Sequence, residues 1–511
     1  MTSARPFGRA ARQSGIAPVK TVGVSAGSRT GPHPWQCRDG AERRRAGLAL
    51  AVAGLVLLLF FWGIGDIPFL SVNEARRAVT VREMYAGGQW LLPVMNGSLY
   101  LAKPPLFYWM ALVPVHMLGA VSEWVMRLPS ALFALTCCGA VYALGARLAG
   151  REVGLYAVIF LAANSDFSAF ARRAEIEMSL TGLCLLSLLA AWPYLFGHGG
   201  RRWVLLSYAL LGACLLTKGP VSLLFVTAPL LVFALLLRHA RAKALLCDVG
   251  GWTVALAIGV SWYLAVSWQE GWGVWSPIFE QDVVAKVSGA AGEPWYSYLL
   301  YLMGAFSPFC LVLLVRPRLL WQEIRAHPEL ALLACSVLVP LLAFSLFSDK
   351  HAKYLLPAYP ALALLLAYRW VHLLGSVPGG WRRLMTRLPL LLLLAFVAFY
   401  AFFESRAFAH RVQVLPQIAA ASADHPSLPI YSVGAPDMRL VYYAGRPVLP
   451  LTAAGVGDHS SVEALLFVKE PMPGALAWMS NCALAQFEPY LAKRKSVLLI
   501  RLGPSCARRP T

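Results

Sequence analysis

Apolar runs long enough to cross a membrane recur along this chain from Ala46 to Phe403. They lie near residues 46–64, 104–120, 126–147, 152–165, 176–195, 203–217, 219–237, 249–267, 296–315, 328–347, 353–372 and 386–403. About 20 consecutive apolar residues form a helix that spans the hydrocarbon core of a bilayer. Only 14% of the 511 residues are charged, whereas a soluble protein carries about a quarter. The pattern predicts an all-α polytopic membrane protein.

The basic residues between the runs indicate which runs cross the membrane, because cytoplasmic loops are enriched in Lys and Arg. Five later loops are basic, and they hold Arg147 and Arg151; Arg201 and Arg202; Arg238, Arg241 and Lys243; Arg316, Arg318 and Arg325; and Arg382, Arg383 and Arg387. If every run crosses and Arg43–Arg45 are cytoplasmic, all five loops fall outside the cytoplasm. If the run 104–120 does not cross, all five move into the cytoplasm together.

The run 104–120 has the composition of an interfacial helix that lies on the membrane surface. It is short, begins with Pro104-Pro105, and contains Tyr108, Trp109 and His116. The prediction is then about eleven transmembrane helices, with the amino terminus in the cytoplasm and the carboxyl terminus outside. The net charge of +20 is explained by cytoplasmic loops, so no nucleic-acid partner is predicted.

Composition divides the chain into three regions. Residues 1–45 are rich in Arg, Gly, Ser and Pro and are predicted to be a disordered cytoplasmic tail. Residues 46–403 form the membrane domain, with residues 65–125 as the first extracytoplasmic loop. Residues 404–511 are predicted to form a small extracytoplasmic α/β domain.

The predicted α/β domain contains short β-rich runs and two helix-like stretches. The β-rich runs are Leu428–Val433, Leu440–Tyr443, Ala464–Val468 and Ser496–Ile500, and the helix-like stretches lie near 409–421 and 484–493. Cys482 and Cys506 are the only cysteines placed on the extracytoplasmic side outside the membrane in this topology. Paired thiols in an oxidising compartment tend to be bridged, so a disulfide is expected; two unrelated thiols are the alternative.

Polar residues gather on the side of the membrane that holds the first extracytoplasmic loop. That loop contains Asn73, Glu74, Arg76, Arg77 and Lys103. The topology places further polar residues on the same side, namely Asp166, Arg172, Arg173, Glu175, Glu177, Lys218, Glu270, Asp282, Lys286, Glu293, Asp349, Lys350, His351 and Lys353. Charges that converge at one membrane face suit a site for an anionic lipid headgroup.

Several short motifs occur in a fixed order along residues 60–365. They are Asn73-Glu-Ala-Arg-Arg-Ala78, Lys103-Pro-Pro105, Arg127-Leu-Pro-Ser130, Glu177, Leu215-Leu-Thr-Lys-Gly-Pro220, Pro294-Trp-Tyr296 and Lys353-Tyr-Leu-Leu-Pro-Ala-Tyr-Pro360. This ordered set resembles the polytopic glycosyltransferases of the GT-C fold. These are the bacterial aminoarabinose transferases of lipid A and the related protein mannosyltransferases.

The resemblance implies transfer of a sugar from an undecaprenyl phosphate carrier to an extracytoplasmic acceptor. Lipid A, another envelope glycan and a protein are all open as acceptors. It also implies a multi-pass protein of the bacterial inner membrane whose carboxyl-terminal domain is periplasmic. Membrane lipids would surround it.

Cations are expected around the phosphate of the donor, because negative charge grows on that leaving group. The residues expected to bind substrate are Arg76, Arg77, Lys103, Arg173, Lys218, Lys350, Lys353 and Tyr354. Arg172 is a further candidate for a bidentate contact. Any one of these cations could instead be an interface anchor.

The chain departs from the family pattern where the catalytic acid is expected. An Asp-Glu pair opens the loop in that family, whereas this chain has Asn73-Glu74. An amide has no useful basic site, so Glu74 and Glu177 are the candidate bases, with Asn73 beside them. Alternatively, Asn73 caps a helix and Glu74 stabilises its first turn.

The chain also departs from the pattern at the positions that the resemblance associates with a metal ion. Ala102 stands where an acid is expected, and residues 268–293 contain no histidine. Asp349 and His351 are too few to define a metal site. No metal cofactor is therefore predicted, although a divalent ion is compatible with the reaction class.

Two other functions are consistent with parts of the sequence. Asn73 and Ala102 would also fit a catalytically impaired relative that binds lipid-linked sugar. A transporter or flippase would need ionisable residues near mid-membrane and broken helices in paired half-repeats. The charges here lie at one face, so a transferase is favoured.

Overall fold

The computed structural model describes residues 34–279, 293–348, 350–458, 462–488, 496–503 and 506. It divides into two units, residues 1–50 and 51–511. In the first unit, helix α1 begins at Pro34 and continues to Phe61 of the second unit. Residues 34–45 are thus helical, and the disordered tail predicted there is wrong over these positions. Proline is favoured at the start of a helix, and no further proline occurs before Pro68.

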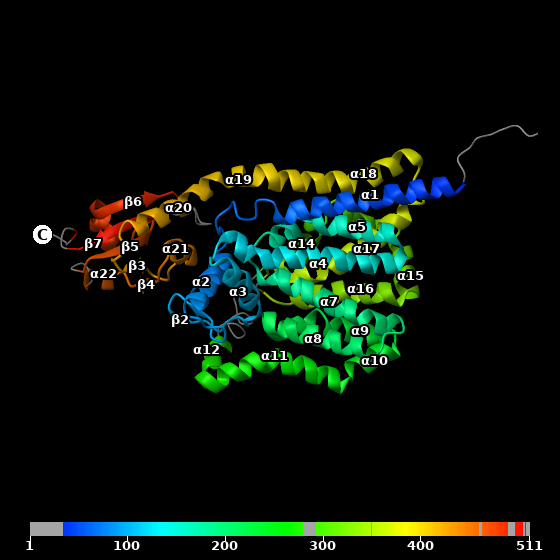
Figure 1. The fold of residues 1–511 in the computed structure, drawn as a ribbon, viewed down its shortest axis with the longest axis horizontal. Coiled ribbons are helices and arrows are strands. Elements are labelled where there is room, and N and C mark those ends of the chain that lie inside the picture. Colours follow the sequence, from blue (N-terminus) through cyan, green and yellow to red (C-terminus); the bar gives the residue numbers. More distant parts are fainter. Residues whose placement is uncertain are drawn as a thin grey trace, which may run out of the picture. The chain divides into compact units, whose positions relative to one another are not determined.

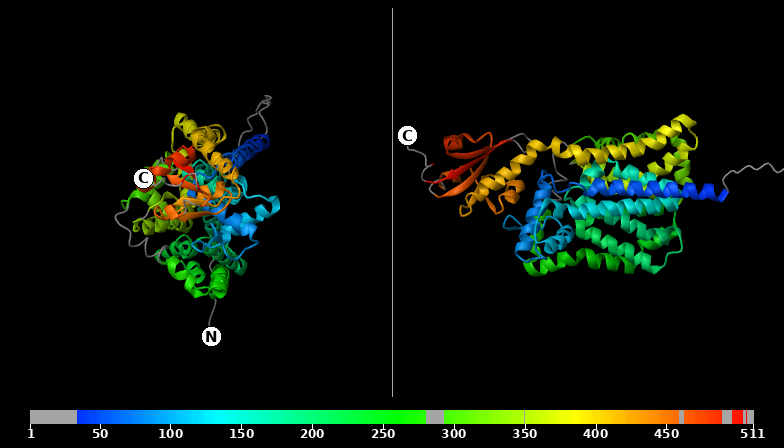
Figure 2. Two further views of the ribbon diagram at one scale, coloured as in Figure 1. Left: turned by 90° about the vertical axis from the view of Figure 1, so that its left-hand side faces the viewer. Right: turned by 45° about the horizontal axis from the view of Figure 1, so that its top comes forward.

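The membrane part of the second unit is built from helices that run side by side (Figure 1, Figure 2). After the first loop they are α4 (Glu123–Ala149), α5 (Arg151–Ala162), α6 (Ser165–Ala171), α7 (Ile176–Phe196), α8 (Arg201–Lys218), η1 (Gly219–Leu224), α9 (Thr227–Leu236), α10 (Ala240–Leu246), α11 (Val249–Glu270), η2 (Trp272–Trp275), α12 (Ser276–Phe279), α14 (Ser297–Ala305), η4 (Phe309–Leu314), α15 (Pro317–Ala326), α16 (Pro328–Ser345), η5 (Ala352–Ala358), α17 (Tyr359–Leu374), α18 (Gly379–Ala398), η6 (Phe399–Phe403) and α19 (Glu404–Ala407).

The number of helices that meet the requirements for a membrane span is lower than predicted. The described residues contain seven helices long and apolar enough to cross a membrane, or eight if the bent pair α5–α6 is one span. The apolar run 296–315 is divided between α14 and η4. The runs 203–217 and 219–237 form one continuous stretch, Arg201–Leu236, in that count.

The stretch Arg201–Leu236 turns back on itself at η1. Lys218, at its middle, contacts Glu177 in the first turn of α7. Arg241, which follows its end, donates to the carbonyls of Tyr194 and Gly197 at the opposite end of α7. The chain therefore runs the length of α7 twice between residues 201 and 241.

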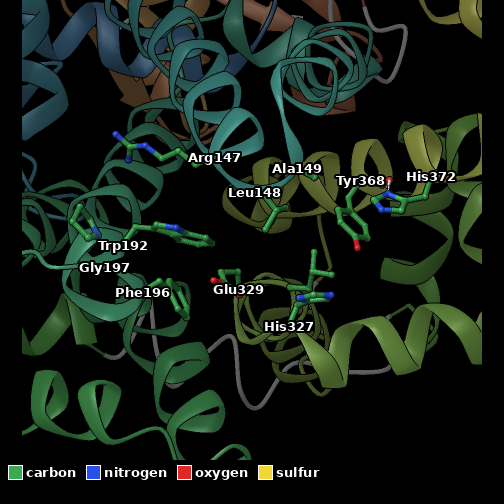
Figure 3. A pocket seen from close by; sticks show the side chains of 12 residues that line it. Arg147, Leu148, Ala149, Trp192, Phe196, Gly197, His327, Glu329, Tyr368 and His372 are labelled. Carbon is green, nitrogen blue, oxygen red and sulfur yellow. Dashed lines mark hydrogen bonds between the residues drawn. The ribbon is translucent and has the colours of Figure 1, made fainter. Parts of the chain in front are cut away.

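Basic loops meet at one end of the helices. A cavity of about 710 Å³ at this end is lined by residues that include Arg147, Trp192, Pro193, Phe196, Gly197, His327, Glu329, Tyr368 and His372 (Figure 3). Arg201 pairs with Asp248, and Arg369 pairs with Glu323 of α15. The start of α7 and the end of α8 lie at the other end, so the predicted common side of these basic loops is confirmed.

The first loop consists of α2 (Val72–Ala86), a two-stranded hairpin and α3 (Leu106–Leu118). The hairpin strands β1 (Val94–Met95) and β2 (Ser98–Leu99) are joined by Asn96-Gly97, whose φ angles are 55° and 75°. Positive φ at both positions is what a two-residue hairpin turn of type I′ requires. Helix α3 has 13 residues and is too short to span a bilayer, in line with its predicted surface position.

Ser71, and not Asn73, caps α2. The Ser71 hydroxyl accepts a hydrogen bond from the Asn73 backbone N–H at 3.2 Å, so the predicted Asn73 cap is wrong. Serine is among the residues preferred at this position because its side-chain oxygen satisfies a free N–H of the first turn. Glu74 lies in the first turn, as the helix interpretation predicted.

The carboxyl-terminal region contains α20 (Ala409–Ala423) and a five-stranded sheet in the order β4-β3-β5-β7-β6. Strands β3 (Ile430–Val433), β4 (Val448–Leu451) and β5 (Ala464–Lys469) are parallel, whereas β6 (Ala483–Phe487) and β7 (Val497–Leu502) pair antiparallel. A short helix α22 (Gly455–Asp458) and a 3-10 helix η7 (Gly474–Cys482) complete it.

Three predicted strands are confirmed as β3, β5 and β7, and the predicted helix near 409–421 is confirmed as α20. The predicted strand 440–443 is wrong, because it forms part of helix α21 (Met438–Tyr443). Asp437 caps this helix by accepting from the Arg439 N–H. Residues 484–487 belong to β6 and not to a helix; residues 489–495 lie outside the described part.

The sheet is covered on both faces. One face packs with α20 and with residues of the first loop in a single core. The other face forms a core that includes Met479, Ile500 and Cys506. Cys482 and Cys506 form a disulfide with their Cα atoms 5.8 Å apart, which confirms the predicted bridge.

Candidate functional site

One buried carboxylate, Glu177, lies among cations from three other elements. Lys218 Nζ at the end of α8 is 3.3 Å from Glu177 Oε1, and Lys353 Nζ of η5 is 3.7 Å from the same oxygen. Arg77 Nη2 of α2 is 3.8 Å from Glu177 Oε2. Residues far apart in the sequence thus meet at the end of the helices that carries the first loop. We call Arg77, Glu175, Glu177, Lys218 and Lys353 the cation cluster.

A second carboxylate, Glu175, lies on the other side of Arg77. Its Oε2 is 3.1 Å from Arg77 Nη1, and its Oε1 accepts from the Ser71 hydroxyl at 3.4 Å. Burial raises the pKa of Glu175 to about 7, and the Glu177 carboxylate adds to the increase while Arg77 opposes it. Glu175 was not among the predicted site residues, and its position two residues before Glu177 was the available signal.

Several polar atoms of the cation cluster have no hydrogen-bond partner among the described residues. They are Arg77 Nε and Glu177 Oε2, together with Arg77 Nη1 and Glu175 Oε2, which are engaged with each other as an ion pair 3.1 Å apart and so are not unused. Buried polar groups are normally hydrogen-bonded, so unused capacity marks a place where a ligand can bind. The cluster has three cations and two carboxylates, which suits an anionic ligand group.

The rim of the cluster carries further predicted residues. The Lys218 ammonium lies 4.9 Å from the centre of the Tyr354 ring, and it interacts electrostatically with Lys103. Arg76, next to Arg77 on α2, is exposed. Lys103 and Tyr354 therefore lie beside the cluster, and Arg76 is exposed on α2 next to Arg77.

Glu74 forms a separate, fully bonded pair with Arg127. Glu74 Oε1 accepts from Arg127 Nε at 2.9 Å and from the Ala174 N–H at 2.9 Å. The same guanidinium donates to the carbonyls of Ile64, Ile67 and Pro68. Glu74 is 2% exposed, and both oxygens of its carboxylate accept hydrogen bonds from within the protein.

Three candidate cations, Lys350, Arg172 and Arg173, lie outside the cation cluster. Lys350 donates to the carbonyls of Glu293 and Phe347. Arg172 donates to the carbonyls of Leu59 and Trp62 and pairs with Glu404 at 3.0 Å. Arg173 is exposed and lines, with Arg172, Glu74 and Ser71, a different cavity of about 180 Å³.

The described residues do not bring three potential metal ligands together. Among the residues that the structure describes, no group of three His, Cys, Asp or Glu side chains could hold a metal ion. Ala102 has no donor atom in its side chain. Asp282, Lys286 and Asp349 lie outside the described residues.

The chain is similar in sequence to known proteins. Residues 102–268 match the family model described as dolichyl-phosphate-mannose-protein mannosyltransferase. An undecaprenyl phosphate-alpha-4-amino-4-deoxy-L-arabinose arabinosyl transferase of Pseudomonas paraeruginosa is 30% identical over 332 residues, which is 62% of this chain and 59% of that protein. An uncharacterised protein of Aquifex aeolicus is 28% identical over 315 residues, 61% of this chain and 62% of that protein. The matched segment thus spans about three fifths of the length of these relatives.

The fold is similar to that of a solved structure. The crystal structure of ArnT from Cupriavidus metallidurans bound to undecaprenyl phosphate has a TM-score of 0.72 and 19% sequence identity, covering 91% of this chain and 99% of that one. The apo structure of the same protein matches equally well, with a TM-score of 0.72. The chain is therefore a multi-pass membrane protein that has the GT-C fold of ArnT and resembles the aminoarabinose transferases and protein mannosyltransferases in sequence.

Proposed function

We propose that this protein is a membrane glycosyltransferase that takes its sugar from an undecaprenyl phosphate carrier. The observation that carries the proposal is the cation cluster, in which Lys218, Lys353 and Arg77 surround one carboxylate and exceed the acids in number. Partly buried cations with spare hydrogen-bonding capacity suit a lipid-linked phosphate. The relatives named for undecaprenyl phosphate support this ligand.

The chemistry follows from the charges of the cluster. The acceptor oxygen forms a bond to the anomeric carbon of the sugar, and the bond from that carbon to the phosphate oxygen breaks. Negative charge grows on the departing phosphate, where Lys218, Lys353 and Arg77 stabilise it. The proton of the acceptor hydroxyl passes to a carboxylate, and Glu177 is the carboxylate that we propose for this role. Arg76, Lys103 and Tyr354 at the rim would contact the donor.

The acceptor lies outside the cytoplasm in this proposal. The basic loops at the opposite end of the helices would be cytoplasmic, with about eleven crossings of a bacterial inner membrane. The first loop and the domain 404–511 would then be periplasmic. The disulfide between Cys482 and Cys506 is consistent with an oxidising compartment. Lipid A, an envelope glycan and a protein remain the candidate acceptors.

A second candidate is a relative that binds lipid-linked sugar without transferring it. Asn73 and Ala102 favour it, because neither side chain can accept a proton. The hydrogen bonds that Glu74 accepts from Arg127 and from the Ala174 N–H engage one of the two remaining bases. Glu177 is then the residue on which transfer depends.

Two measurements test the proposal. The purified protein should bind undecaprenyl phosphate, and cells that lack the protein should accumulate a lipid-linked sugar that mass spectrometry identifies. Incubation of that isolated donor with the protein should release undecaprenyl phosphate. Binding without release would select the second candidate, and absence of binding would contradict both.

The orientation has its own test. A cysteine introduced at Gly455 in a variant without other reactive thiols should react with an impermeant reagent from the periplasmic side. Reaction only after the membrane is opened would reverse the proposed topology.

A further inference from the structure

The carboxyl-terminal domain shares a hydrophobic core with the first loop. Ala75 and Ala78 of α2 and Leu440 and Val441 of α21 are buried in one cluster. Helices α2 and α21 are in direct contact. Apolar packing of this kind holds two elements together, but it does not by itself define their relative position as directional hydrogen bonds do.

Directional contacts are present where the chain enters α2. The backbone N–H of Phe69 donates to the Tyr443 hydroxyl at 2.8 Å, and that hydroxyl donates to Glu123. Arg439 Nη1 donates to the Leu70 carbonyl at 2.8 Å. The domain therefore accepts a hydrogen bond from the Phe69 N–H and donates one to the Leu70 carbonyl, in the segment just before the Ser71 cap.

The two side chains that make these contacts are themselves held in place. Arg439 forms two further hydrogen bonds to Asp437, at 2.9 and 2.7 Å. These bonds outweigh the effect of burial and lower the pKa of Asp437, so the pair remains charged. The neighbouring Tyr442 donates to the Val121 carbonyl and packs against the Phe69 ring at 4.9 Å.

From this segment the contacts continue into the site. The Phe69 ring lies 5.2 Å from the Arg127 guanidinium, which binds Glu74. Ser71 caps α2 and also donates to Glu175 of the cation cluster. Any shift of residues 69–71 would move the start of α2, and with it Arg76 and Arg77.

A second attachment lies at the other end of α2. Arg82 donates to the carbonyls of Tyr442 and Val441 at 2.8 and 3.1 Å, where the last carbonyls of α21 lack helical partners. The side chain of Asn96 pairs with both the N–H and the carbonyl of Val448 in the edge strand β4. Helix α2 is thus held by the domain at its beginning and near its end.

We propose that the carboxyl-terminal domain is a positioning element of the active site, and that Tyr443 and Arg439 act as positioning residues for α2. The domain then does more than cover the membrane part. The expected effect on ligand binding rests on the proposed function. The expected effect on the stability of residues 69–74 does not depend on that function.

The test compares Tyr443→Phe with Ile500→Val in the full-length protein. Tyr443→Phe removes the hydroxyl and retains the ring. Ile500 is fully buried in the core on the other face of the sheet, so its truncation loosens the same domain without touching the first loop. Amide hydrogen exchange of a peptide that contains Phe69 to Glu74 should become about tenfold faster in Tyr443→Phe, because one hydrogen bond is lost. It should not change in Ile500→Val.

Undecaprenyl phosphate binding provides the second measurement. We expect Tyr443→Phe to bind about tenfold more weakly, because small displacements of positioned groups are costly, and Ile500→Val to bind like the wild type. Equal affinity of Tyr443→Phe and the wild type would overturn the inference, as would equal losses in both variants. If the wild type does not bind undecaprenyl phosphate, the proposed function fails, and the exchange measurement still decides whether Tyr443 holds the segment.

Discussion

Two acidic residues at the same end of the helices, Glu74 and Glu177, have opposite surroundings. Glu74 accepts three hydrogen bonds of 2.9 to 3.4 Å, two from Arg127 and one from the Ala174 N–H. Glu177 faces three cations at 3.3 to 3.8 Å, and its Oε2 has no hydrogen bond among the described residues. A saturated pair stabilises the fold, whereas an unsaturated group with surplus cations remains able to bind a ligand.

The largest expected effect is a loss of stability when the hydrogen-bonded pair of Glu74 and Arg127 is disrupted. Arg127→Ala would leave Glu74 buried without its partner and the carbonyls of Ile64, Ile67 and Pro68 without a donor. Removal of one member of a buried ion pair costs about 3–5 kcal/mol, so thermal unfolding in detergent should occur at a much lower temperature. Arg501→Ala is the matched control, because its pair with Glu463 is exposed and should contribute less than about 1 kcal/mol. Similar melting of both variants would contradict the structural role of the Glu74–Arg127 pair.

The second largest expected effect is a loss of turnover, which tests whether Glu177 accepts the proton of the acceptor hydroxyl. Glu177→Gln keeps the shape of the side chain but not its basicity. We expect turnover of the isolated donor to fall at least about a hundredfold, while undecaprenyl phosphate binds as well as before or more tightly, because a negative charge is removed from an anion site. Full turnover in Glu177→Gln would show that Glu177 does not accept the proton, and it would then not differ in function from Glu74.

A smaller effect is expected when one cation is removed. Lys218→Ala should weaken undecaprenyl phosphate binding by about tenfold or more, the contribution of one charge-assisted hydrogen bond. Lys243→Ala removes an exposed lysine from α10, among the basic loops at the opposite end of the helices, and should leave the affinity unchanged. Equal affinities of the wild type and Lys218→Ala would reduce Lys218 to a surface anchor.

The smallest effect concerns the protonation of Glu175. Because its pKa is raised to about 7, Glu175 gains a proton as the pH falls from 8 to 6, and the cation cluster becomes more positive by one charge. We expect binding of undecaprenyl phosphate to strengthen about threefold over this range, as one screened charge several ångströms away implies. The ligand phosphate also titrates near pH 6, so Glu175→Gln provides the reference in which only the ligand changes. The same pH dependence in both proteins would rule out Glu175 as its source.

The sequence alone predicted the features that depend on local pattern. Apolar runs of membrane length, the common side of the basic loops, three of the strands and helix α20 follow from composition and periodicity over neighbouring residues. The cysteine pair 482 and 506 followed from the few thiols outside the apolar runs. Errors occurred where a single residue decides the local structure. Asp437 caps a helix that contains residues 440–443, and Ser71 occupies the N-cap position that was predicted for Asn73.

Only the tertiary structure decided which predicted residues meet in the cation cluster. Glu74 and Glu177 are equivalent candidates in the sequence, and they are distinguished by partners that lie far along the chain. Arg127 is 53 residues from Glu74, and Lys353 reaches Glu177 from a different element, η5. Lys350 lies only three residues from Lys353, yet it is bound to backbone carbonyls. A side chain's chemical role depends on the charges and hydrogen-bonding groups that surround it, and in this protein those groups are brought together by helix packing and by the docking of the carboxyl-terminal domain.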